Sequence, residues 1–138
     1  MLALATEEIA SALASLSEAY EQLDEHSAER LEQELFRPIQ MAYGRAKRTH
    51  TEFAHRHDLP SREFALAYAG APSQGARAFI DSAMDAASRA DGELASMQDS
   101  MLPVEVGDAE LRAGLEEVRK LIGPLRGRAR EFVRTLGR

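Results

Sequence analysis

Apolar side chains recur at alternating intervals of four and three residues through most of the chain, and this spacing limits the fold more than any other feature. One series consists of Leu111, Leu115, Val118, Ile122, Leu125, Ala129, Phe132 and Leu136. The same intervals connect Ala76, Ile80, Ala83, Ala87, Ala90, Leu94, Met97 and Met101. Such spacing is typical of helices that pack side by side at shallow angles. Because no stretch alternates with period two, we predict an all-α protein.

The first part of the chain carries a similar pattern, and we predict one long helix over residues 4–57. Its apolar series is Ile9, Leu13, Leu16, Tyr20, Leu23, Leu31, Leu35, Ile39, Ala42, Ala46, Thr49 and Phe53. Pro38 removes a backbone donor and is expected to kink this helix, which would be about 80 Å long. A sharp corner between two helices at Pro38 is the alternative.

Turn-forming residues divide the rest of the sequence. The segment 58–61 (DLPS) ends the first helix, 70–73 (GAPS) separates a short helix from a long one, and 103–107 precedes the last helix. Asp108 suits the N-cap of that last helix. The pair Gly123-Pro124 is expected to kink it, and termination there is the alternative. The prediction is an elongated antiparallel bundle, four-helix-bundle-like, that forms one domain over 1–138.

Composition narrows the class of protein further. The chain has no cysteine, which excludes disulfides, thiolate metal ligands and a cysteine nucleophile. The N-terminus lacks the basic flank of a signal peptide, and no stretch approaches the roughly 20 apolar residues of a membrane span. We therefore expect a cytoplasmic protein.

Charged residues are arranged in blocks of alternating sign, although the net charge of the whole chain is −6. Residues 1–36 carry nine acids and one base, and residues 111–138 carry eight bases and three acids. Such blocks neutralise each other when the chain folds back on itself or pairs with a copy of itself. We expect the acids of 7–36 to lie beside the bases of 111–138 in the same chain, or beside those of 37–57 in a partner.

The shorter helices that follow can cover only part of a helix about 80 Å long. Either the helix bends at Pro38 and completes a four-helix bundle, or its exposed apolar stripe pairs with a second chain. The second outcome gives the leading hypothesis. It is a non-enzymatic interaction or structural module, a homo-oligomer (dimer) or the partner of another helical protein. The predicted contact residues lie on the spare apolar stripe and are Tyr20, Leu23, Leu31, Leu35 and Phe36. Replacing Leu31 and Leu35 by charged residues is expected to leave a helical but monomeric protein. No cofactor and no catalytic residue is predicted.

The stretch HTEFAHRHDLP at residues 50–60 raises a second hypothesis, a ferritin-like metal-binding bundle. Glu52 and His55 have the Glu-x-x-His spacing of metal sites in helical bundles, but such sites need two of these motifs and further inward glutamates. Helical geometry turns both side chains away from Phe53 and the apolar stripe. The stretch is better explained as the basic end of a helix, where cations favour the dipole.

A third hypothesis is an adaptor for an anionic partner. It rests on one flank of the last helix, which carries Arg112, Arg119, Arg126, Arg130 and Arg134. The acidic net charge and the lack of aromatic side chains between these arginines disfavour nucleic acid. The acidic first 36 residues disfavour a membrane surface.

Overall fold

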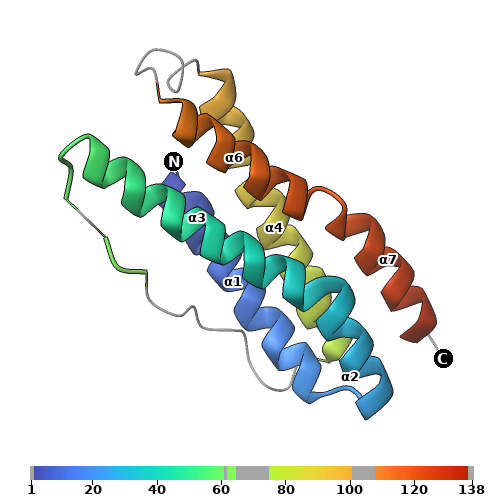
Figure 1. The fold of residues 1–138 in the computed structure, drawn as a ribbon. Coiled ribbons are helices and arrows are strands. Elements are labelled where there is room, and N and C mark those ends of the chain that lie inside the picture. The colour runs from blue at the N-terminus through green and yellow to red at the C-terminus, as the bar shows by residue number, and fades with distance from the viewer. Residues whose placement is uncertain (1, 61, 65–74, 101–107, 137–138) are drawn as a thin grey trace.

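The computed structural model describes residues 2–60, 62–64, 75–100 and 108–136, which contain helices and no strand. The helices are α1 (Leu2–Glu21), α2 (Glu25–Leu31), the π-helical turn η1 (Glu32–Phe36), α3 (Arg37–Arg56), α4 (Ala76–Asp99), α6 (Ala109–Ile122) and α7 (Leu125–Leu136). Figure 1 shows them as a bundle in which α2, η1 and α3 follow one another as a single rod. The all-α helical bundle predicted from the spacing is confirmed.

The single long helix over 4–57 is wrong, because the chain reverses between Glu21 and Glu25. Asp24 has an extended backbone, and its carboxylate accepts a hydrogen bond from the Ser27 N–H at 2.8 Å. This N-cap satisfies a donor that a helix start leaves open, so a new helix begins there. The reversal lets α1 and α3 bury their apolar faces against each other within one chain.

Pro38 lies within the first turn of α3, directly after the π-turn, and no corner forms there. The Arg37 N–H reaches back five residues to the Glu32 carbonyl. A π-turn inserts one extra residue into a helix. The hydrogen-bond pattern therefore changes just before Pro38, which has no backbone N–H to donate. The irregularity expected at Pro38 therefore takes the form of a π-turn, while the true reversal lies before Glu25.

The last rod keeps its apolar phase across Gly123 and Pro124, as the spacing predicts. Gly123 has helical backbone angles, and its N–H donates to the Arg119 carbonyl at 2.8 Å. The apolar residues from Leu111 to Phe132 in this series are all buried. The rod is thus interrupted only briefly, between α6 and α7, and both parts face the same core.

The two ends of the bundle bring different helix termini together. Leu2 of α1, Phe53 of α3 and Met97 of α4 line one hollow, so these termini share an end. At the other end, Arg30 of α2 donates to the Thr135 hydroxyl of α7 at 3.0 Å. Hence α3 and α4 run in the same direction. The end of α3 and the start of α4 therefore lie at opposite ends of the bundle (Figure 1). Bundles with one long crossover share this arrangement. The predicted short helix lies largely outside the described residues.

Small side chains set the closest packing in the core. α1 makes its most extensive contact with α4. The buried face of α1 runs through Leu2, Ala5, Ile9, Ala12, Leu16 and Ala19. The facing helix buries Ala83, Ala86, Ala87 and Ala90. Alanines on both helices let the backbones approach closely.

One glycine marks a second close approach, between α3 and α6. A Cβ on Gly114 would lie 2.4 Å from Oγ1 and 2.6 Å from Cγ2 of Thr49. Thr49 is buried, its hydroxyl donates to the Arg45 carbonyl at 2.8 Å, and its branched side chain has little freedom to move aside. Gly114 is therefore required by the distance between the two helices.

We expect Gly114→Ala to lower the free energy of unfolding by up to about 2 kcal/mol. Overpacking costs about 1–3 kcal/mol, and the gain in helix propensity offsets about 1 kcal/mol of this cost. Gly127→Ala in α7 is the matched control, since its Cβ would meet nothing within 4 Å. That variant should gain up to about 1 kcal/mol. Urea denaturation followed by circular dichroism measures both, and equal stability of the two variants would contradict this packing.

Candidate interaction surfaces

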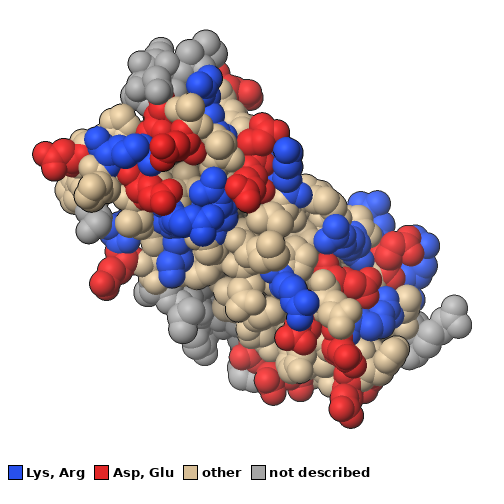
Figure 2. Space-filling view, viewed as in Figure 1, with Lys and Arg blue, Asp and Glu red and all other residues tan. Residues whose placement is uncertain are grey.

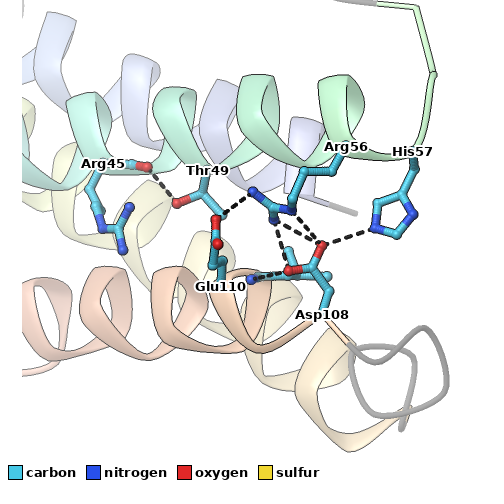
Figure 3. A network of polar contacts seen from close by, with 7 residues as sticks. Arg45, Thr49, Arg56, His57, Asp108 and Glu110 are labelled. Carbon is cyan, nitrogen blue, oxygen red and sulfur yellow. Dashed lines mark hydrogen bonds and ion pairs between the residues drawn. The ribbon is translucent and has the colours of Figure 1, made fainter.

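A buried carboxylate, Asp108, joins the end of α3 to the start of α6 (Figure 3). Its side chain is 4% exposed and caps α6 by accepting the Leu111 N–H at 2.9 Å. The Arg56 guanidinium donates to both carboxylate oxygens at 2.8 Å, and His57 Nε2 lies 2.9 Å from Oδ2. A carboxylate only accepts, so His57 Nε2 carries the hydrogen. Arg56 also pairs with Glu110 at 2.9 Å.

The pKa of Asp108 reflects these contacts. Burial alone would raise this pKa. The hydrogen bonds from Leu111, His57 and Arg56, together with the charge of Arg56, have a larger and opposite effect, and they lower the pKa from 3.8 to about 2. The carboxylate stays ionised near neutral pH with its oxygens occupied, so it is a clamp between two helices and not a general base. The sequence indicated the cap at Asp108 and the basic end of α3 separately, but no motif indicated that the two would meet.

Ion pairs within the chain follow a pairing different from the predicted one. Arg45 of α3 pairs with Glu117 of α6 at 2.7 Å, and Arg119 of α6 pairs with Asp91 of α4 at 2.8 Å. Among the described residues, no ion pair joins the acids of 7–36 to the bases of 111–138. Figure 2 accordingly shows both signs of charge interspersed over the visible face.

Glu52 and His55, the pair considered for a metal, are both exposed on α3, as helical geometry predicts. Within the described part of the chain, no group of three or more His, Asp or Glu side chains is arranged to hold a metal ion.

His50, in the same stretch, is half-buried beside a hollow of about 210 Å³ that Phe53 and Leu59 help to line. Its Nδ1 is buried and has no hydrogen-bond partner in the described structure, and its ring meets Phe64 edge-on at 5.3 Å. Burial and the charge of Arg62 lower the pKa of His50, so the ring is neutral at pH 7.

The predicted contact residues separate into two groups. Leu31 and Leu35 are fully buried in the core of the chain itself, so they do not lie on a spare apolar stripe. Tyr20 is 40% exposed, and Leu23 and Phe36 are half-buried. The physical reason is the reversal before Glu25, which folds the stripe of α2 and η1 inward and leaves Tyr20 at the surface.

Tyr20 and Phe36 border a hollow of about 210 Å³ between the end of α1 and the π-turn. Ser17, Glu21 and Glu32 complete its lining. Among the described residues, the carboxylates of Glu21 and Glu32 take part in no ion pair. We call Tyr20, Glu21, Glu32 and Phe36 the acidic aromatic patch. π-turns occur frequently at functional sites, and the sequence showed no sign of this one.

The predicted arginine flank does not form one continuous surface. Arg119 is half-buried and committed to Asp91 and Gln98, and Arg112 is exposed on α6. The other three arginines, on α7, line a groove of about 760 Å³ between α4 and α7, which the sequence did not predict. Arg77 of α4 joins them, and Met84, Ala129 and Val133 supply the apolar part of the lining. We call the surface formed by Arg77, Met84, Arg126, Ala129, Arg130, Val133 and Arg134 the cationic groove.

No known protein family, curated protein or solved structure shows significant similarity to this chain. Of the helices that the structure describes, none combines the length and apolar character needed to cross a bilayer. A helical bundle does not by itself define a function, which depends on the sites on its surface.

Proposed function

We propose that this chain is a non-enzymatic interaction module that self-associates through the acidic aromatic patch. The observation that carries the proposal is the exposed Tyr20 beside Phe36, in a hollow whose two carboxylates lack ionic partners among the described residues. Aromatic side chains that fill pockets at the centre of an interface supply much of the binding energy in protein complexes. A surface of this kind favours an apolar partner with cationic side chains around it.

The polar groups in the interior support a binding role over a catalytic one. Asp108 is the one buried carboxylate among the described residues, and its donors hold it ionised. Thr6 and Thr49 donate their hydroxyls to backbone carbonyls of their own helices at 2.8 Å. Groups held in this way serve the fold, whereas acid–base catalysis needs a group poised to exchange a proton near the working pH.

Tyr20→Ser is expected to weaken self-association by at least about tenfold in the dissociation constant, because an interface aromatic contributes about 2 kcal/mol or more. Folding should be unaffected, since Tyr20 is 40% exposed and is not part of the buried core. Met41→Ser is the matched control, because Met41 is 57% exposed on the outer face of α3, away from the patch. Light scattering over a concentration series measures both variants.

The control makes the result specific. A mass curve for Met41→Ser that follows the wild type, with that of Tyr20→Ser shifted to higher concentration, supports the patch. If both variants associate like the wild type, the acidic aromatic patch is not the contact surface.

A further inference from the structure

We infer that the acidic aromatic patch of one copy docks into the cationic groove of the next, in a head-to-tail arrangement. This inference rests on the proposed function and names the surface that receives the patch. The charge of the groove is opposite to that of the patch. Four arginines and two aspartates line the groove, in a chain whose net charge is −6.

The arginines of the groove differ in how far they are neutralised. Arg126 pairs with Asp85 at 3.2 Å, and Arg134 pairs with Glu131 at 3.2 Å. No described residue forms a hydrogen bond or an ion pair with Arg77 or Arg130. Two guanidinium groups are thus free to meet two carboxylates of the patch, and an arginine–carboxylate pair is among the strongest charge-assisted contacts.

Polarity also matches. The groove, at about 760 Å³, is large enough for bulky side chains, and Met84, Ala129 and Val133 offer apolar atoms inside it. The exposed Tyr20 supplies a ring for that apolar lining, next to the half-buried Phe36 and with Glu21 and Glu32 beside it. Contact between two acidic patches would instead place four carboxylates together, and this like-charge juxtaposition opposes a patch-to-patch dimer.

The order of the helices around the bundle fixes the symmetry. α1 packs against α4 on one side and η1 on the other, and α7 also packs against α4 and η1. The patch lies between α1 and η1, and the groove lies between α4 and α7, so the two surfaces are on opposite sides of the bundle. One copy cannot use both surfaces on the same neighbour, so the assembly is a ring or an open chain and not a closed two-fold pair. The sequence had suggested a dimer.

Mixing two complementary variants tests this arrangement. The patch variant is Tyr20→Ser with Glu32→Gln, and the groove variant is Arg77→Glu with Arg130→Glu. Each keeps one surface intact, so each alone should have the mass of a single chain. Mixed together, the intact patch of the groove variant meets the intact groove of the patch variant. The mixture should therefore contain particles of twice the single-chain mass and nothing larger.

The outcomes separate this inference from the proposed function. If the wild type associates but the mixture stays at the single-chain mass, the groove does not receive the patch, although self-association stands. A groove variant that keeps the mass of the wild type overturns the inference in the same way. The inference also fails if the wild type binds a single-stranded DNA probe and the groove variant loses this binding while it keeps the wild-type mass. A wild type that is itself monomeric overturns both. Circular dichroism checks each variant, and Arg130→Ser replaces the groove variant if that variant loses helicity.

Discussion

Leu35→Ala is expected to lower the free energy of unfolding by about 2–5 kcal/mol, a large part of the roughly 5–15 kcal/mol that stabilises a typical domain. Leu35 is fully buried on the π-turn, where α1, α3 and α7 all contact that turn. Truncation leaves a cavity that rigid neighbouring helices fill only in part. A charged residue at Leu35 or Leu31 should therefore unfold the chain. If these leucines lay on an exposed long helix, as the sequence suggested, the same substitution would give a folded monomer.

Met41→Ala is the control for Leu35, since it truncates a large apolar side chain on the same rod at an exposed position. It should change stability by less than about 0.5 kcal/mol. Chemical denaturation followed by circular dichroism compares the two. If Leu35→Ala unfolds like Met41→Ala and also lowers the native mass, Leu35 lies at a contact between chains and the reversal before Glu25 is wrong.

Asp108→Asn is expected to lower the free energy of unfolding by about 2 kcal/mol at pH 7. The pKa of Asp108 falls from 3.8 to about 2 in the folded chain, and each pKa unit corresponds to about 1.4 kcal/mol. Asparagine keeps the shape and the capping oxygen but not the charge that Arg56 contacts. The main loss is therefore the ionic attraction across the α3–α6 contact.

The sign of the pH dependence follows from the lowered pKa. Asp108 contributes its full stabilisation above the unfolded value of 3.8, and this contribution is lost as the pH falls through about 2. The gap between wild type and Asp108→Asn should therefore be constant from pH 7 to about 5 and close by about pH 2. Glu52→Gln, an exposed carboxylate on α3, should show almost no gap. A constant difference down to pH 2 would show that Asp108 is not stabilised as a carboxylate.

The sequence predicted the later helices well and the first one poorly, and α1 shows why. Two apolar series with the same spacing share Ile9 and Leu16. One continues through Leu13, Tyr20 and Leu23, and the other through Leu2, Ala5, Ala12 and Ala19. Greater hydrophobicity favours the first series, but the alanine series allows close contact with the alanines of α4, and the structure buries it. Periodicity alone does not decide between them, because the partner helix determines which one packs.

The reversal before Glu25 was missed for a related reason. Asp24 and Ser27 form a local capping pattern, but neither glycine nor proline lies nearby, and the apolar series continues on both sides. A continuous rod and a tight reversal fit such a pattern equally well. The error carried over to the site, because a chain that turns back buries Leu31 and Leu35 and leaves only part of the predicted contact surface exposed. The clamp at Asp108 and the cationic groove depend on contacts between distant residues, which spacing does not show.

The native mass of the unmodified chain over a range of concentrations tests the central claim most directly. One chain has a mass of 15.2 kDa. We predict that the mass rises above this value with concentration. The rise should be stronger at low salt, because salt screens the attraction between the carboxylates of the patch and cationic side chains. A constant mass of 15.2 kDa up to the highest soluble concentration, at low and high salt, would contradict a module that binds its own kind.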